Sequence, residues 1–299
     1  MPELGGSIRV ARIRFVGCLL IAAVTLLHGY AIAQNSPEGD KFLTLWVGTL
    51  PVIITAPHGG RERIPGIAPR RGVGVRQFTA ERDSNTAELA QAVAIKLRQR
   101  SGGTPFLIIA RFERKFIDAN RDPGAAYETP QAKPYYESYH RGIRMSAETI
   151  RQRWGGGLLL DIHAQGAQAE TIFRGTHNGR SVSQLRKQFG EAALSGPKSV
   201  LGHLASIGYK IQPDLAGQEQ ETRYSGGFTT RTYGSHQGTN IDAIQLELGR
   251  SLRAKANLER TADDLARAIE VFAREYLLKR RGDGAGAPHV FPAAPKSPE

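Results

Sequence analysis

Two apolar runs that each lead to a histidine constrain this chain more than any other feature of its sequence. The first run, residues 52–56 (VIITA), is followed after one proline by His58, and the second, residues 158–162 (LLLDI), leads directly to His163. Runs of this kind are typical of buried strands in an α/β sheet, and such sheets bind ligands at the carboxyl ends of their strands. We therefore predict that the two histidines share one site and that this site binds a metal ion.

The first 33 residues are expected to form a signal peptide. Three arginines between residues 9 and 14 precede an apolar stretch, residues 15–27, and Ala31-Ile32-Ala33 resembles a small-residue cleavage site. An uncleaved anchor is the alternative, although the stretch is shorter than the roughly 20 apolar residues that a membrane span needs. We therefore expect an exported, periplasmic protein with no stable membrane span after signal cleavage.

Composition limits the site and the number of domains. Cys18 is the only cysteine and lies in the expected signal peptide, so the mature chain offers no disulfide and no thiolate ligand. Any metal site must therefore use His, Asp and Glu. Residues 34–281 suit a single domain, and the Gly/Pro/Ala-rich residues 282–299 are expected to be disordered.

The formal charge of +12 at pH 7 bears on the partners. A basic chain can bind nucleic acid, an anionic surface or an acidic small substrate. No basic run is interleaved with aromatic residues, so we expect no nucleic-acid partner. Much of the excess charge lies in Arg61, Arg63, Arg70, Arg71 and residues 279–281, which are interpreted as solvated surface.

Strand-like and helical patterns alternate along the chain. Strands are expected near residues 43–47, 52–56, 106–110, 158–163, 171–173 and 243–248, and helices near 80–99, 133–154, 182–193 and 258–278. This alternation predicts an α/β fold with three layers, in which a mostly parallel or mixed sheet is covered by helices on both faces.

The third metal ligand should be a carboxylate, and two candidates remain open. A catalytic zinc site uses three protein ligands and keeps one position free for water. Glu62 follows His58 on the same loop, whereas Asp83 lies at the expected start of the helix after the first histidine strand. That helix packs back on the sheet, so its amino end returns to the carboxyl edge, which favours Asp83. An aspartate at a helix start is also a common N-cap.

Two further features suggest chemistry. Glu247 lies inside an apolar strand run, where a carboxylate is costly unless it is paired or functional, so it is a candidate general base. The alternative is that strand alternation turns it toward solvent. Residues 111–121 (RFERKFIDANR) carry arginines that suit bidentate binding of a substrate carboxylate. If this run stood alone, it would be interpreted as a basic face exposed to solvent.

Together these blocks resemble the N-formylglutamate amidohydrolase family, which has the fold of the zinc carboxypeptidases. The resemblance extends from about Pro51 to Arg250. The matching blocks, in order, are Pro57-His58-Gly59-Gly60 with Ile64-Pro65, Asp83 with Thr86, Arg114 with residues 117–121 (IDANR), Tyr139-His140, residues 160–163 (LDIH), residues 226–234 (GGFTTRTYG) and residues 245–248 (QLEL).

The resemblance implies a metal site and a base. His58 and His163 would bind Zn²⁺ together with Asp83 or Glu62, and Glu247 would activate water. Zinc carboxypeptidases carry a glutamate three residues after the first histidine. Arginine stands at that position here, so the choice between the two carboxylates stays open.

The resemblance also implies how substrate is held. Arg114 would polarise the scissile carbonyl, Asn120 and Arg121 would hold the substrate carboxylate, and Arg231 would be a second anion donor. The expected function is zinc-dependent hydrolysis of an amide bond next to a carboxylate, in N-formylglutamate or another small acidic acylamino acid or peptide. The alternatives are a periplasmic cell-wall peptidase or amidase, and a carboxylate-binding protein without catalysis.

Overall fold

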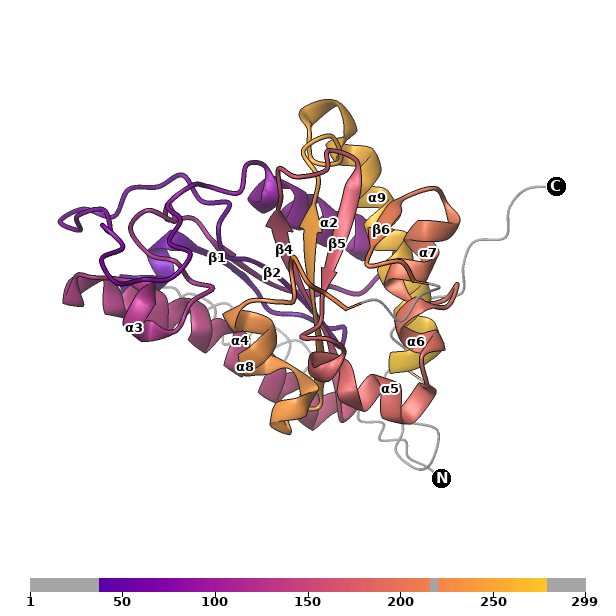
Figure 1. Cartoon of the computed structure of the whole chain (residues 1–299). Helices are drawn as coiled ribbons and strands as arrows, with labels where there is room; N and C mark the ends of the chain where they lie inside the picture. Colours follow the sequence, from indigo (N-terminus) through magenta and orange to yellow (C-terminus); the bar gives the residue numbers. More distant parts are fainter. Residues whose placement is uncertain (1–37, 216–219, 279–299) are drawn as a thin grey trace, which may run out of the picture.

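The computed structural model of the protein describes residues 38–215 and 220–278 (Figure 1). The expected signal peptide and the expected disordered tail lie outside the described residues, so both stay predictions. Within the described ranges, no helix is both long enough and apolar enough to cross a membrane.

A seven-stranded mixed sheet forms the centre of the molecule (Figure 1). Its strands are β1 (Leu43–Trp46), β2 (Val52–Ala56), β3 (Phe106–Ala110), β4 (Gly157–Ala164), β5 (Thr171–Gly175), β6 (Lys210–Gln212) and β7 (Ile241–Leu248). They lie in the order β1-β3-β2-β4-β7-β5-β6, with β3, β2, β4 and β7 parallel to one another. β1 pairs antiparallel with β3, and β5 pairs antiparallel with β7. The predicted mixed sheet is confirmed.

Helices cover both faces of this sheet. The longer ones are α2 (Thr86–Ser101), α4 (Lys133–Trp154) and α9 (Lys255–Phe272), and the shorter ones are α3 (Pro123–Ala126), α5 (Ser183–Phe189), α6 (Ala192–Ser195), α7 (Val200–Ser206) and α8 (Phe228–Tyr233). Short 3-10 turns at Glu38–Phe42, Pro130–Ala132, Arg180–Val182 and Ser235–Gln237, and a π-helical turn at Ala273–Leu277, complete the elements. The predicted three-layer α/β/α arrangement is confirmed.

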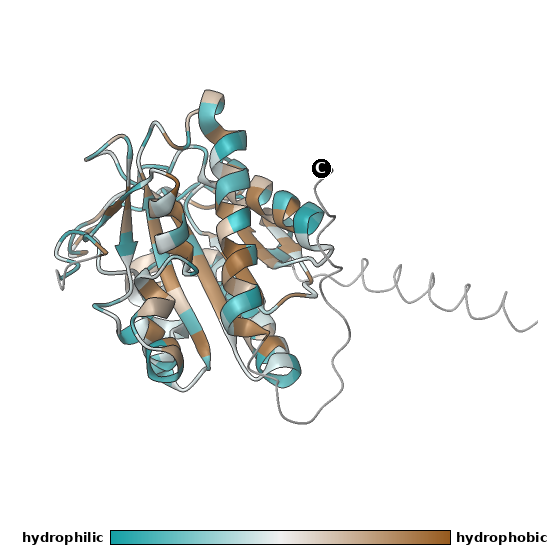
Figure 2. Cartoon of the chain, turned by 90° about the vertical axis from the view of Figure 1, so that its right-hand side faces the viewer, coloured by the Kyte–Doolittle hydropathy of each residue, from teal (hydrophilic) through white to brown (hydrophobic). Residues whose placement is uncertain are grey.

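Strand alternation divides the apolar side chains between two cores. Val52 and Ile54 pack with α2 and α9 on one face, whereas Ile53 packs with α4 on the other. Figure 2, turned toward the α9 side, shows mostly brown strands behind helices that alternate between brown and teal along their length. The parallel strands β2, β3 and β7 are fully buried, as expected of a sheet covered on both faces.

The connections on the two sides of β2 run in opposite directions along the sheet. From β2 the chain crosses through α2 to β3 on one side, and from β3 it crosses back through α4 to β4 on the other side. The direction in which strands are added to the sheet therefore reverses between β2 and β4, and ligands of open α/β sheets bind at the carboxyl edge where the strand order reverses in this way. His58, just after β2, and His163, near the end of β4, lie at this point.

Some element boundaries differ from those predicted. The helix expected from residue 80 begins at Thr86, because residues 80–85 belong to the long loop that returns from β2. The segment expected as one helix over 182–193 is divided into α5 and α6 around Gly190. β6, α7 and α8 were not predicted, because segments of three to seven residues carry too little periodicity to be recognised.

Candidate metal centre

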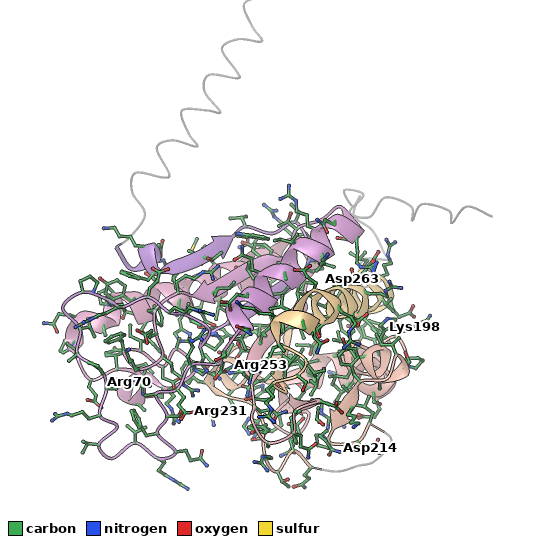
Figure 3. All side chains as sticks on the ribbon, turned by 90° about the horizontal axis from the view of Figure 1, so that it is seen from above. Arg70, Lys198, Asp214, Arg231, Arg253 and Asp263 are labelled. Carbon is green, nitrogen blue, oxygen red and sulfur yellow. The ribbon has the colours of Figure 1, made fainter. Side chains whose placement is uncertain are left out.

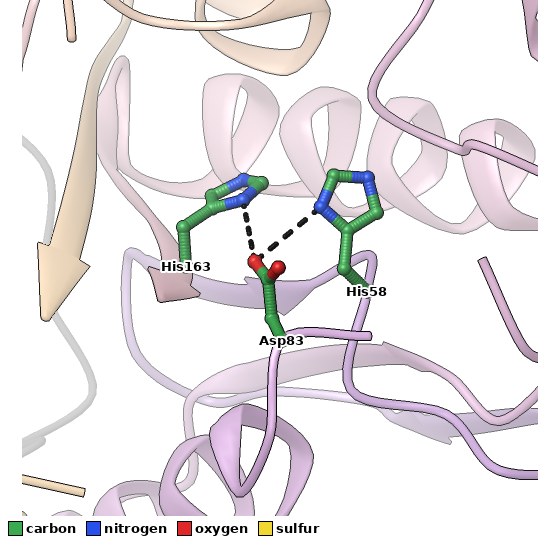
Figure 4. Close-up of side chains that lie close together, drawn as sticks. All are labelled: His58, Asp83 and His163. Carbon is green, nitrogen blue, oxygen red and sulfur yellow. Dashed lines mark hydrogen bonds and ion pairs between the residues drawn. The ribbon is translucent and has the colours of Figure 1, made fainter. Parts of the chain in front are cut away.

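His58, Asp83 and His163 converge at the carboxyl edge of the sheet (Figure 4). Asp83 Oδ2 lies 3.2 Å from His163 Nδ1 and 3.5 Å from His58 Nδ1. The two imidazole rings meet edge to face, with centroids 4.9 Å apart. All three side chains are buried. Three donors of the kind that zinc prefers are therefore held together by three separate segments.

The spacing of these atoms fits a shared metal ion. Tetrahedral ligands at about 2.0–2.1 Å from zinc lie about 3.3 Å from one another, which is close to the separations from Asp83 to the two histidines. His58 Nδ1 is also buried and has no hydrogen-bond partner among the residues that the structure describes. A buried nitrogen that faces a carboxylate and lacks a hydrogen bond needs a ligand, because an unsatisfied polar group is costly in the interior. The residues therefore fit a bound metal.

A second carboxylate orients each histidine from behind. Asp118 Oδ1 lies 2.6 Å from His58 Nε2, and Asp161 Oδ2 lies 2.9 Å from His163 Nε2. Both aspartates are fully buried. A carboxylate on one ring nitrogen fixes the imidazole and directs the lone pair of the other nitrogen toward a metal. Both Nδ1 atoms are thus prepared to be ligands.

Asp83, and not Glu62, is the carboxylate that the fold brings to the histidines. Glu62 is exposed, and its backbone pairs with residues 111–113 on the outer side of the loop. Asp83 reaches the site because Gly59 lets the loop pass close to α2: a Cβ at Gly59 would lie 2.4 Å from the Ala87 nitrogen. The N-cap position of α2 is Asn85, so Asp83 is not the helix cap.

Charge interactions oppose the effect of burial on these groups. Burial alone would raise the pKa of the Asp83 carboxyl, but His163 and His58 lower it well below its usual range. The same holds for Asp118, whose pKa is raised by burial but lowered more strongly by His58 and Arg114. Burial would lower the pKa of His163, whereas Asp161 and Asp83 raise it. The site therefore favours negative aspartates facing a positive centre.

Glu247 lies beside the cluster on β7. It is in register with His163 on the neighbouring strand β4, so both side chains are on the same face of the sheet. Gln245 Nε2 donates a 2.8 Å hydrogen bond to Glu247 Oε1. The side chain is buried, so the alternative of a solvent-facing strand position is wrong. Burial raises the pKa of Glu247 to about 7.

Arg114, predicted to polarise the scissile carbonyl, and Asn120, predicted to hold the substrate carboxylate, line the cluster. Arg114 donates from Nε to Asp118 at 3.0 Å, and its Nη1 lies 3.5 Å from Asp83 Oδ1. Asn120 Nδ2 lies 3.1 Å from His163 Nε2, and Asn120 Oδ1 accepts a 2.7 Å hydrogen bond from the Thr229 nitrogen. Both side chains therefore touch the metal-binding group or its supporting carboxylates.

Arg121 and Arg231 have different surroundings. Arg121 donates to Asp118 at 3.2 Å and to the carbonyls of Arg76 and Gln77. Much of its donor capacity is thus used to hold the long loop after β2. Arg231 is exposed on α8, and among the described residues its guanidinium has no hydrogen-bond or ion-pair partner. Figure 3 views the molecule from above relative to Figure 1 and labels Arg231 together with Arg70 and Arg253.

Arg70 corrects the interpretation of the basic loop as solvated surface. Its side chain is almost fully buried, donates to the carbonyls of Thr79 and Arg114, and lies 3.8 Å from Asp118. Its guanidinium also stacks 5.0 Å over the Phe78 ring. The sequence pattern did not indicate that Arg70 is buried, because its partners Arg114 and Asp118 are distant from it in the sequence.

Three functional positions were not predicted. Asp161 precedes His163 by two residues and Gln245 precedes Glu247 by two residues, so the strand period of two places each pair on one face. That periodicity was a usable signal. Asp118, by contrast, meets His58 only through the tertiary fold, across 60 residues of chain. Only its place in the Ile-Asp-x-Asn-Arg block indicated it.

Known proteins of one family resemble this chain. A sequence model of the N-formylglutamate amidohydrolase family matches residues 124–254. An N-formylglutamate deformylase of Pseudomonas putida is 26% identical over 271 residues, which cover 80% of this chain and 95% of that protein. The resemblance to the N-formylglutamate amidohydrolase family is confirmed.

Solved structures share the fold. The N-formylglutamate amidohydrolase of Ralstonia eutropha JMP134 superposes with a TM-score of 0.56 at 18% identity, over 80% of this chain and 99% of that one. A gene product of Agrobacterium tumefaciens gives 0.51 at 15% identity, over 81% of this chain and 96% of that one. The mixed sheet with helices on both faces is therefore a fold that this chain shares with these two structures.

Proposed function

We propose that the protein is a zinc-dependent amidohydrolase that cleaves an amide bond next to a carboxylate, in N-formylglutamate or another small N-acyl amino acid. The observation that carries the proposal is the convergence of His58 Nδ1, His163 Nδ1 and Asp83 Oδ2 beside a buried Glu247. The family resemblance supports the reaction class, because the related P. putida protein is an N-formylglutamate deformylase.

Zinc is proposed because of the donor set. Two neutral imidazoles and one carboxylate, with carboxylates behind both rings, are typical of catalytic zinc sites that keep one coordination position free. When bound, zinc would act as a Lewis acid that lowers the pKa of water and polarises a carbonyl. His58, His163 and Asp83 would hold it.

Glu247 is proposed as the general base. A carboxylate whose pKa lies near 7 is suited to accept a proton from water at neutral pH and to return it to the leaving nitrogen. Gln245 holds Glu247 Oε1, and among the described residues no hydrogen bond engages Oε2. The free oxygen can therefore take part in proton transfer while the other fixes the side chain.

Arg114 and Asn120 are proposed to orient the substrate. The Nε of Arg114 is fixed by Asp118, which leaves its terminal nitrogens at the edge of the cluster for the scissile carbonyl oxygen. The Asn120 amide lies between His163 and the amino end of α8, where it can meet a substrate carboxylate. Arg121 is proposed to assist through the donors that its loop contacts leave free.

Arg231 is proposed as a second hydrogen-bond donor to the anionic group of a small acidic substrate. Its guanidinium is exposed and has no carboxylate partner within residues 38–215 and 220–278, so it is available for bidentate binding. Arg180 adds positive charge close to Arg231. Burial is the main cause of the lowered pKa of His177, and the charges of Arg180 and Arg231 lower that pKa further, so both arginines lie near this imidazole. A positive surface of this kind attracts anionic substrates.

The test combines metal analysis with a hydrolysis panel. The mature protein should hold about one zinc per chain and release amino acid from N-formylglutamate or other N-acyl amino acids. His58→Ala and His163→Ala should each abolish zinc retention, whereas His203→Ala on α7 serves as a matched control that keeps it. Absence of zinc would favour a non-catalytic binding protein, and cleavage of muropeptides alone would favour a cell-wall amidase.

A further inference from the structure

We infer that Arg253 is a positioning residue that holds the metal-binding side chains and the base in register with one another. Its guanidinium donates to three backbone carbonyls in three different segments of the chain: Nη1 to Ser84 at 2.7 Å, Nε to Leu248 at 3.2 Å and Nη2 to Gln165 at 3.4 Å. The inference rests on the proposed function, because it assigns a role toward the proposed zinc site.

Each of these carbonyls belongs to a residue one or two positions after a proposed functional residue. Ser84 directly follows Asp83, Leu248 directly follows Glu247, and Gln165 stands two residues after His163. The planar peptide unit of Ser84 begins at the Cα next to Asp83, and that of Leu248 at the Cα next to Glu247, so a bond to either carbonyl holds the short backbone segment that carries the functional residue. One guanidinium therefore ties together two of the three proposed metal ligands and the proposed base.

The arginine itself is well anchored. The Asn85 side chain donates a 2.9 Å hydrogen bond back to the Arg253 carbonyl, so the segment before α2 and Arg253 hold each other in both directions. The turn that carries Arg253 is fixed by bonds from the Ser251 and Gly249 nitrogens to the carbonyls of Ala169 and Thr171. Figure 3 shows Arg253 beside the start of α9, near the middle of the carboxyl-edge view.

Only a planar fork can serve these three acceptors at once. The guanidinium has five N–H groups in a fixed plane, whereas the lysine ammonium is a compact point charge that cannot span carbonyls from three segments. Arg253 is attracted by Asp83 and Glu247, and lysine would keep that attraction. Arg253→Lys therefore separates the positioning role from a purely electrostatic one.

The competing interpretation is an ordinary loop anchor that stabilises the fold without affecting the site. Arg100 provides the matched control: it forms a bidentate ion pair with Asp263, at 3.1 and 3.0 Å, that joins the far end of α2 to α9. Like Arg253, it links segments distant in sequence, but it lies at the opposite end of α2 from Asp83.

The experiment measures zinc affinity of the metal-free full-length protein by competition with a chromophoric chelator, together with its melting temperature. Supporting groups behind metal ligands typically change metal affinity by roughly 10–100-fold, so Arg253→Lys should weaken zinc binding by about that factor. Its melting temperature without metal should fall no further than that of Arg100→Lys. Arg100→Lys should keep native zinc affinity.

A second variant tests the same contact independently, in case Arg253→Lys fails to fold. Asn85 has a positive φ of 65°, so Asn85→Gly removes the bond to the Arg253 carbonyl without straining the backbone. It should weaken zinc binding less than Arg253→Lys but in the same direction. Zinc affinity within twofold of native in both variants would overturn the positioning role while the proposed function stands. A native protein that binds no zinc would overturn the proposed function itself.

Discussion

Replacing Glu247 by glutamine tests the proposed chemistry most directly. Glutamine has the same shape, and its side-chain oxygen can still accept the hydrogen bond from Gln245, but it cannot take a proton from water. Removal of a general base lowers kcat by roughly 10²–10⁴-fold, or about 3–5 kcal/mol of transition-state stabilisation. Zinc content should stay native, because Glu247 is not one of the proposed ligands.

The same substitution should stabilise the metal-free protein at alkaline pH. Burial raises the pKa of Glu247 from 4.5 to about 7, and about 1.4 kcal/mol per pKa unit makes the ionised form cost about 3 kcal/mol of folding free energy. Because the folded state holds the proton more tightly, this cost is absent below about pH 4.5, grows as pH rises, and is complete above about pH 7. Glutamine carries no charge and avoids it throughout.

The assay pairs steady-state kinetics with denaturant unfolding of chelator-treated protein at pH 4.5 and pH 8. The variant should gain up to about 3 kcal/mol over the native protein at pH 8 and little at pH 4.5. Glu259→Gln, an exposed carboxylate on α9, should change neither kcat nor stability by a comparable amount. Near-normal kcat in Glu247→Gln would refute the catalytic role, and equal stability at pH 8 would refute the effect of burial.

Three further predictions concern the ligand set, the substrate and export. Asp83→Ala should strip zinc from the purified protein and Glu62→Ala should not, because only Asp83 lies against the histidines; metal analysis with the reverse result would exchange their roles. Arg231→Gln should raise KM with kcat little changed, as expected for an anion bound equally in substrate and transition state; steady-state kinetics that show a fall in kcat alone would contradict this. The exported protein should begin at Gln34, and an intact mass that includes residues 1–33 would instead indicate a membrane anchor.

Much of the fold follows from periodicity alone. The strands at 52–56 and 106–110 and the helix at 133–154 occur within the predicted bounds, because each is long enough, or apolar enough, to show its period. The late start of α2 could not be foreseen. Asn85 adopts a left-handed conformation ahead of the helix, and the loop before it is held by a bond from the Asp83 nitrogen to the His58 carbonyl.

The residues of the candidate site also include some that the sequence pattern reveals and some that it does not. His58, His163 and Glu247 were recognised because they interrupt or end apolar strands, which a sequence displays directly. Burial of Arg70 was missed, because it depends on carbonyl acceptors at Thr79 and Arg114 that only the folded loop supplies. Local patterns reveal residues delivered by strands, whereas residues delivered by a long loop depend on contacts that the pattern does not contain.

Asp118 joins the basic block to the candidate metal centre, so this block is not a separate substrate clamp. One of its oxygens holds His58, and the other accepts from Arg114 and Arg121. His58 and two arginines therefore share one buried carboxylate, and interactions with His58, Arg114 and Arg70 hold the pKa of that carboxylate low despite burial. Asn120, two residues further, reaches His163 on the other side of the cluster. Residues that the sequence assigned to substrate binding thus also position the two histidines, so a substitution in this block should be judged by metal affinity as well as by KM.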